Sequence, residues 1–146
     1  MITLKEISEE NVVTICELDV APDQRDQVAP NAVSIAEGNY AERAWFRAIY
    51  DGETPVGFVM LALEHDKNEY YLWRLMIDQR YQGKGYGKAA MKLVVAFLKT
   101  MPQVEELLTS YVPNGELGAN HFYESIGFID TGRIDHGEVV MRMPIR

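Results

Sequence analysis

The sequence predicts one α/β domain, more closely α+β, in which helices flank a mixed, mostly antiparallel sheet. Three observations support this fold class. Three strand-like segments follow one another between residues 44 and 78 with only short turns between them, as in an antiparallel meander. Amphipathic helical patterns lie on either side of that stretch. The chain has 146 residues, 47% of them hydrophobic, so we expect residues 1–146 to form a single domain around a sizeable core.

The first part of the chain is expected to form a strand and two helices. Residues 2–7 alternate apolar and polar side chains, which predicts an opening strand. Ser8 is expected to cap a helix that runs to about Leu18, because acidic residues fill its first turn. A short helix is expected from Asn31 to Glu37, and Gly38 is expected to end it.

The rest of the chain is expected to alternate strands and helices. The meander strands are expected at residues 44–50, 55–64 and 70–78. Apolar residues recur every three or four positions from Ala90 to Leu98 and predict an amphipathic helix. The remaining expected elements are a strand at 104–112, a helix at 116–126 and two strands at 127–132 and 137–143.

Composition argues against several classes of function. The formal net charge is −8 and the pI is near 4.8. Binding to nucleic acid needs a basic surface, so we expect no nucleic-acid partner. No apolar run is long enough to span a membrane and the first ten residues lack a signal-peptide pattern, so we expect a cytoplasmic protein with no membrane partner. The single cysteine, Cys16, is expected to pack in the core, and the histidine spacing predicts no metal site.

The segment with the most chemical information is DQRYQGKGYGK, from Asp78 to Lys88. It lies between an expected strand and an expected helix and contains Gly83, Gly85 and Gly87. Backbone N–H groups at a helix N-terminus bind anions, above all phosphates, and glycines let a phosphate approach the backbone closely. Neither the P-loop pattern nor the dinucleotide fingerprint fits, because the required Ser or Thr is missing and the glycines are spaced by two. The segment therefore predicts a different phosphate-bearing ligand.

Two motifs resemble those of the GNAT superfamily of N-acetyltransferases. The hexapeptide QGKGYG resembles the signature Q/R-x-x-G-x-G/A, with Gln82, Gly85 and Gly87 at its defined positions. The segment ANHFYESIGF, residues 119–128, resembles the second motif A-x-x-[LF]-Y-x-x-x-G-F at the usual separation. The resemblance implies a GNAT-like acyl-CoA N-acyltransferase fold, acetyl-CoA (coenzyme A) as co-substrate, and transfer of the acetyl group to an amine. It covers the whole chain in element order and is closest over residues 71–128.

The same resemblance assigns roles to individual residues. In relatives the fourth strand splays from the next one, and its free backbone groups pair with the pantetheine arm of the coenzyme. A backbone N–H of Met76 or a neighbour is expected to polarise the thioester carbonyl. Tyr123 is the expected general acid for the leaving thiolate, because a phenol with a pKa of about 10 keeps its proton at neutral pH. The expected coenzyme-binding residues are Leu75, Met76, Ile77, Gln82, Gly83, Lys84, Gly85, Tyr86, Gly87, Lys88, Asn114, Asn120 and Tyr123.

The sequence departs from the family pattern at one position and leaves one role open. Relatives usually carry an asparagine seven residues before the motif tyrosine, where this chain has Glu116. Asn114 and Asn120 are the nearby asparagines to which a coenzyme contact is assigned instead. The general base stays open. Three carboxylates are candidates, directly or through water, although each also fits an ordinary surface position: Glu37, Glu64 and Glu69.

The expected acceptor is a polyamine. The segments WRLMIDQRYQGKGYGK, VAPNAVSIAE and TGRIDHGEVVMRM resemble bacterial spermine/spermidine (diamine) acetyltransferases, and an acidic protein attracts a polycation. By the same resemblance Asn31, Ser34 and Glu37 are expected to line the acceptor cleft, and a homodimer would be in keeping with relatives. Two alternatives stay open: acetylation of a protein N-terminus or lysine, and a non-catalytic acyl-CoA-binding regulatory module.

Overall fold

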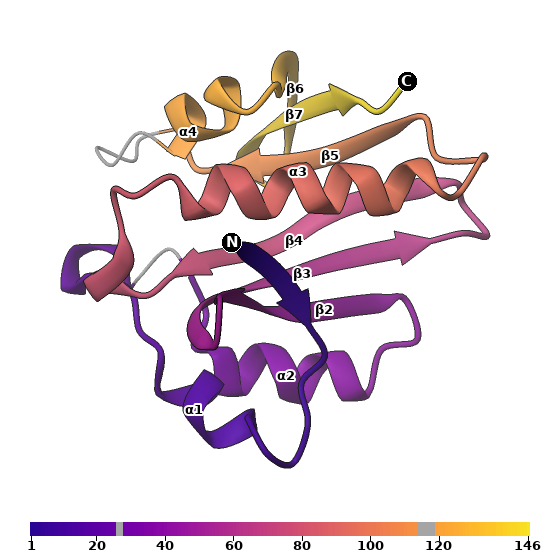
Figure 1. Cartoon of the computed structure of the whole chain (residues 1–146). Coiled ribbons are helices and arrows are strands. Elements are labelled where there is room, and N and C mark those ends of the chain that lie inside the picture. Colours follow the sequence, from indigo (N-terminus) through magenta and orange to yellow (C-terminus); the bar gives the residue numbers. More distant parts are fainter. Residues whose placement is uncertain (26–27, 114–118) are drawn as a thin grey trace.

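The computed structural model describes residues 1–25, 28–113 and 119–146. Its strands are β1 (Ile2–Lys5), β2 (Ala44–Asp51), β3 (Thr54–Glu64), β4 (Glu69–Ile77), β5 (Glu106–Tyr111), β6 (Ile129–Asp135) and β7 (Glu138–Pro144). They form one seven-stranded sheet in the order β1-β2-β3-β4-β5-β7-β6 (Figure 1). Neighbouring strands are antiparallel except β4 and β5, which are parallel. The predicted fold class, with a mostly antiparallel sheet, is therefore confirmed.

Helices cover both faces of this sheet. They are α1 (Val12–Glu17), α2 (Asn31–Asn39), α3 (Tyr86–Lys99) and α4 (Ala119–Ser125), with 3₁₀ turns at Pro22–Gln24 and Gln79–Tyr81. The helix α3 runs across one face, while α1 and α2 lie below the first strands in Figure 1. The order of elements agrees with the order expected from the sequence.

The core has two layers because the central strand β3 is buried on both faces. Val59 and Leu61 pack into a cluster with the apolar stripe of α3, whereas Phe58 and Met60 pack with residues of α1 and α2. Side chains of successive strand residues point to opposite faces of a sheet, which explains this alternation. The strand β3, which precedes β4, is thus held from both sides.

Two predicted helix ends were wrong, each for a local reason. The first helix begins at Val12, not after Ser8, because the Asn11 side chain accepts the Ser8 N–H at 2.8 Å and holds residues 8–11 in a turn. The second helix does not end at Gly38 but continues to Asn39. A Cβ on Gly38 would lie 2.5 Å from Cε1 of Phe46, so this glycine allows close approach to β2 instead of ending the helix.

Strands β4 and β5 form a fork. Among the described residues their ladder consists of one parallel pair, Tyr71 with Leu108, and the Thr109 hydroxyl donates to the Leu72 carbonyl at 3.5 Å just beyond it. A bulge opposite Met60 and Leu61 brings Trp73 into β4 as an extra residue. Within the part of the chain that the structure describes, the rest of β4 therefore has no strand partner on one edge, as the resemblance implied for this strand.

Candidate active site

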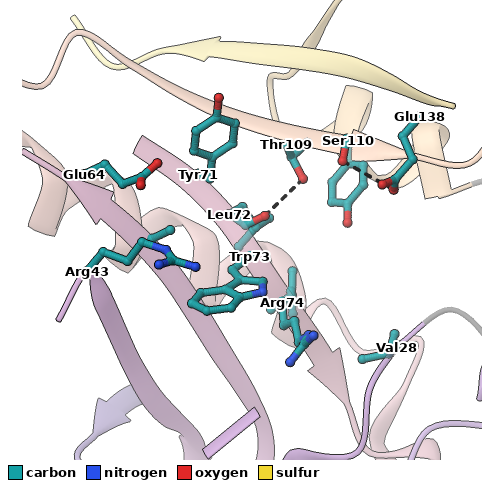
Figure 2. Close-up of a pocket in the computed structure, with 13 residues that line it drawn as sticks. Val28, Arg43, Glu64, Tyr71, Leu72, Trp73, Arg74, Thr109, Ser110 and Glu138 are labelled. Carbon is teal, nitrogen blue, oxygen red and sulfur yellow. Dashed lines mark hydrogen bonds between the residues drawn. The ribbon is translucent and has the colours of Figure 1, made fainter. Parts of the chain in front are cut away.

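Two adjoining cavities open where β4 and β5 diverge. The larger one, about 660 Å³, lies between the end of β4, the glycine-rich segment, α3 and α4. The smaller one, about 430 Å³, extends along β4 past Trp73 toward Glu64 (Figure 2). The residues that line both cavities form what we call the junction: Val28, Leu75, Ser110, Tyr123 and Glu138.

The glycine-rich segment presents open backbone to the larger cavity. Gly83 and Gly85 have φ angles of +79° and +81°, in the left-handed region that residues with a Cβ rarely adopt. Gly85 is the N-cap of the 14-residue helix α3. An added Cβ at either glycine would meet no atom within 4 Å, so space above the backbone is open to a ligand. This geometry fits the pyrophosphate of a coenzyme at a helix N-terminus.

Side-chain hydrogen bonds fix the start of that segment. Gln82 Nε2 donates to the carbonyl of Ile77 at 2.9 Å and to Oε1 of Gln24 at 2.8 Å. Asp78 is 2% exposed and accepts the Asp19 N–H at 3.0 Å and the Arg80 side chain at 2.8 Å. Burial alone would raise the pKa of Asp78, but the hydrogen bonds from Arg80 and Asp19 outweigh it and lower the pKa. The loop is thus tied to the chain segment after α1.

Most residues predicted to bind the coenzyme gather at the larger cavity. Those that line it are Leu75, Met76, Ile77, Gln82, Gly83, Gly85, Tyr86, Gly87, Lys88, Asn120 and Tyr123. Lys84 is not among the described residues that line it. The Tyr86 hydroxyl donates to Asp51 at 2.8 Å, and this hydrogen bond, together with smaller effects that include the charge of Lys84, lowers the pKa of Asp51. The prediction for Asn114, like the position of Glu116, lies outside the described residues.

The open edge of β4 exposes the backbone groups of alternate residues. A Cβ on Gly57 would collide with the carbonyl oxygen of Met76, so that carbonyl is directed at β3. Successive strand residues direct their N–H and C=O groups to opposite edges. Leu75 and Ile77 therefore direct theirs toward the cavities, and Leu75 lies at the junction. The Met76 side chain is buried with residues of α1 and α2.

Tyr123 brings a protonated phenol to the junction. It lies on α4, and its ring packs edge-to-face against Phe122 and Phe128, with centroids 5.8 and 5.6 Å away. Burial raises the pKa of Tyr123, and the negative charge of Glu138 adds to this rise against a lowering hydrogen bond with Thr109. A phenol with a raised pKa holds its proton at neutral pH and can donate it during a reaction.

Both signs of charge line the smaller cavity. The Trp73 ring is flanked by the guanidinium groups of Arg43 and Arg74, at 5.0 and 5.7 Å from its centroid (Figure 2). Arg74 forms an ion pair with Glu37 at 2.6 Å, so its charge is compensated. Glu64 and Glu138 lie at opposite ends of the cavity in Figure 2.

The three carboxylates considered as general bases have different surroundings. Glu64 lines the smaller cavity. Glu37 is engaged by Arg74. Glu69 accepts the hydroxyl of Tyr71 at 2.7 Å, and burial followed by this hydrogen bond raises the pKa of Tyr71 to about 12. Neither Glu37 nor Glu69 is among the described residues that line these two cavities.

The residues predicted to line the acceptor cleft do not lie on the walls of either cavity. Asn31 is 2% exposed and donates to the carbonyl of Ile15 at 2.8 Å. Ser34 is 1% exposed and accepts a hydrogen bond from Arg74 at 3.1 Å. Asn31, Ser34 and Glu37 are absent from the described linings of both cavities. Their positions do not support direct contact with an acceptor, whereas Ser34 and Glu37 do hold Arg74, which lines the smaller cavity.

Sequence reasoning missed the side of the site that β5 and β7 form. The unpredicted lining residues there are Thr109, Ser110 and Glu138. The sequence carries a local signal only for the turn before Glu138, a glycine between two strand-like runs. In the structure His136 and Gly137 have φ angles of +50° and +79° and make a two-residue hairpin turn that pairs Asp135 with Glu138. Which strand the hairpin joins could not be read from that turn.

Two adjoining cavities, with a glycine-rich helix N-terminus on the larger one and a phenol and a carboxylate where they meet, fit the class of acyl-CoA-dependent acyltransferases. The chain belongs to the GNAT acetyltransferase family, whose sequence model matches residues 30–128. It is therefore an acetyl-CoA-dependent N-acetyltransferase, as the two motifs implied.

One curated relative agrees with this family, and two solved structures share the fold. The chain is 30% identical over 150 residues to the spermine/spermidine N(1)-acetyltransferase of Bacillus subtilis, covering 96% of each. A chimera of Vibrio cholerae spermidine N-acetyltransferase SpeG has the same fold, with a TM-score of 0.74, 15% identity and coverage of 99% and 95%. The PaiA N-acetyltransferase of Thermoplasma acidophilum, solved with coenzyme A, gives a TM-score of 0.70, 15% identity and 99% coverage of both chains.

Two further findings concern metals and membranes. Among residues 1–25, 28–113 and 119–146, no three His, Cys, Asp or Glu side chains gather as they would around a metal ion. Within the same residues, no helix is long and apolar enough to cross a membrane.

Proposed function

We propose that this enzyme acetylates a primary amine of a polyamine such as spermine or spermidine. The observation that carries the proposal is the smaller cavity, which has a carboxylate at each end, Glu64 and Glu138, and meets the coenzyme cavity at Tyr123. A polyamine carries several ammonium groups along a flexible chain, so Glu64 can hold a distal ammonium group while the reacting amine lies at the other end, a fit that a monoamine cannot make. The name of the Bacillus relative, similar over 96% of the chain, supports the same acceptor class.

The proposed coenzyme site uses backbone groups more than side chains. Acetyl-CoA supplies an acetyl group activated as a thioester. The N–H groups around Gly83 and Gly85 hold the pyrophosphate, and the open edge of β4 binds the pantetheine arm as a neighbouring strand would. We assign polarisation of the thioester carbonyl to the N–H of Leu75, because the Met76 backbone is directed at β3.

Tyr123 is the proposed general acid. Its phenol lies at the junction, where the leaving sulfur must be if the acetyl group is to reach the smaller cavity. Burial favours the neutral phenol, so the proton is present when the thiolate departs. The phenol gives its proton to the sulfur and regains one before the next cycle.

A panel of acceptors tests the proposed substrate class. Values of kcat/KM would be measured for spermine, spermidine, putrescine, a simple monoamine, basic peptides and amino acids. We expect spermine and spermidine to exceed putrescine, and putrescine to exceed the monoamine. A kcat/KM for peptides that exceeds the values for polyamines by tenfold or more would overturn the polyamine assignment. It would leave the assignment as an acetyltransferase unchanged.

One observation favours a second candidate. Arg43 stacks on Trp73 inside the smaller cavity, and among the described residues no carboxylate forms an ion pair with it. A guanidinium placed there suits an acceptor with a carboxylate near its amine, as in a peptide or amino acid. Arg43→Ala separates the two candidates, because it should raise KM for such acceptors and leave or lower KM for polyamines.

A further inference from the structure

We propose that Glu138 is the general base that takes the proton from the attacking amine. This inference rests on acetyl transfer to an amine, which the family establishes, and not on the acceptor being a polyamine. It fills the role that the candidates Glu37, Glu64 and Glu69 left open.

The position of Glu138 meets the first requirement for a base. The amine nitrogen must reach the thioester carbon where the two cavities join, and a base must lie within hydrogen-bond reach of that nitrogen. Of the described residues that line both cavities, Glu138 is the one with a carboxylate. Glu64 lies at the far end of the smaller cavity in Figure 2, where it suits a distal ammonium group.

The fold holds Glu138 in place from two sides. The turn at His136 and Gly137 fixes it at the first position of β7, and the pairing of β7 with β5 brings it beside Ser110. The Ser110 hydroxyl donates to Glu138 Oε1 at 3.4 Å (Figure 2). Oε2 has no hydrogen bond from the described residues, which leaves it available to an amine.

Glu138 and Tyr123 form an acid–base pair across the junction. Both residues line both cavities, and the charge of Glu138 adds to the rise that burial causes in the pKa of Tyr123. A carboxylate that accepts a proton and a phenol that donates one supply both proton transfers of acyl transfer from one location.

Protons and electrons balance in the proposed transfer of the acetyl group to the amine. The acceptor arrives as an ammonium ion, and Glu138 takes one of its protons and releases it to solvent. The neutral nitrogen then bonds to the carbonyl carbon, its second proton passes to Glu138, and the carbon–sulfur bond breaks with its electron pair on sulfur. Tyr123 protonates that sulfur. Glu138 is then a neutral acid and Tyr123 a phenolate, and one proton returned from Glu138 to Tyr123, directly or through water, restores both.

The test compares Glu138→Gln with the wild type on whichever acceptor gives the highest kcat/KM in the panel. We expect the single-turnover rate of acetyl transfer to fall about 10²–10⁴-fold at pH 7 with little change in KM. The deficit should shrink as pH rises toward the pKa of a free amine, about 10, because the amine then loses its proton to solvent. Glu105→Gln, an exposed residue before β5, is the matched control and should behave as wild type.

Two readouts do not depend on turnover. Calorimetry should give unchanged coenzyme A affinity for Glu138→Gln, which also shows that the variant folds. In protein labelled at tyrosine Cζ, the NMR titration of Tyr123, assigned with Tyr123→Phe, should move to lower pH in Glu138→Gln and stay in place in Glu105→Gln.

Several results would overturn the proposal. A raised KM with a wild-type single-turnover rate would make Glu138 an ammonium-binding residue. A rate deficit that is the same at every pH would exclude proton transfer. If Glu138→Gln does not fold, Glu138→Asp is used instead, and wild-type rates with a carboxylate one methylene shorter would exclude a positioned base. If another acceptor class gives the highest kcat/KM in the panel, the polyamine proposal is rejected, and the proposal for Glu138 is unaffected.

Discussion

At the scale of single residues, the Tyr123 hydroxyl is the group whose loss should be simplest to interpret. Tyr123→Phe keeps the ring and its contacts with Phe122 and Phe128, so the free energy of unfolding should change little. We expect kcat to fall about 10²–10⁴-fold with coenzyme A affinity unchanged. Single-turnover kinetics measures the fall in the rate of acetyl transfer, and calorimetry measures the affinity for coenzyme A. A wild-type single-turnover rate would leave Tyr123 as a packing residue.

The buried carboxylate of Asp78 should make stability depend on pH. Its pKa is lowered in the folded state, so its contribution is fully present above the pKa of the unfolded chain, near 3.9, and is lost as pH falls through the folded value. Asp78→Asn should cost about 1–3 kcal/mol at pH 7, because hydrogen bonds from Asp19 and Arg80 lose a charged acceptor.

Urea unfolding at pH 7, 5 and 3 measures this effect. The gap between wild type and Asp78→Asn should be the same at pH 7 and 5 and should be narrower at pH 3, below the pKa of the unfolded chain. Asp66→Asn, in the exposed turn between β3 and β4, is the matched control and should show no such closing gap. A gap that stays constant with pH would contradict a role for the Asp78 charge.

The residues that sequence reasoning identified share one property. Gln82, Gly85 and Tyr123 belong to short motifs whose spacing along the chain is the signal. Glu138 and Ser110 meet across two strands, and their proximity depends on the register of β5 with β7, which no local spacing encodes. Asn31 and Ser34 are polar residues on a helix, and burial beneath the site was as compatible with the sequence as a place in it.

At the scale of elements, the contact between α3 and α4 depends on Gly87. A Cβ there would lie 3.0 Å from Cζ of Phe122, which lines the coenzyme cavity, so the ring must move. We expect Gly87→Ala to weaken coenzyme A binding by about tenfold, or roughly 1.4 kcal/mol. Adding Phe122→Leu removes the clashing ring and should restore part of the affinity.

Calorimetry on the two single variants and the double variant measures the coupling. Gly132→Ala is the control, because a Cβ there meets nothing within 4 Å, while its φ of +76° makes the substitution strained in a way that does not involve Phe122. It should lose some stability and no coenzyme affinity. Additive losses in the double variant would show that the Phe122 ring is not what Gly87 accommodates.

Most elements could be predicted, and their ends less well. The meander from β2 to β4 followed from apolar runs separated by polar turns, and α3 from its apolar spacing. The start of α1 was misplaced because either Ser8 or Asn11 can end a turn before a helix, and the Asn11 hydrogen bonds decide between them. Gly38 was misread because a glycine that stops a helix and one that admits a neighbouring Phe46 look alike in sequence.

At the scale of the whole molecule, the net charge of −8 should affect the acceptor more than the coenzyme. Attraction between a polycation and an acidic protein is screened over about 10 Å at 0.1 M salt and about 3 Å at 1 M. We expect KM for spermine to rise with salt while KM for a monoamine changes less. A KM for spermine that is independent of salt would argue against electrostatic recognition, and kcat serves as the internal control.

The fork divides the sheet into two leaves, β1 to β4 and β5 with β7 and β6, joined by one backbone pair and by the side chains beneath α3. Units joined by so little backbone can open separately, so the smaller leaf should behave as its own cooperative unit in amide hydrogen exchange. The larger cavity, where we propose that the coenzyme binds, is lined by residues of both leaves. Binding of the coenzyme should therefore slow exchange in β5 and β7 more than in β2 and β3. This substrate would then complete the sheet, because it would fill the place of a strand between β4 and β5.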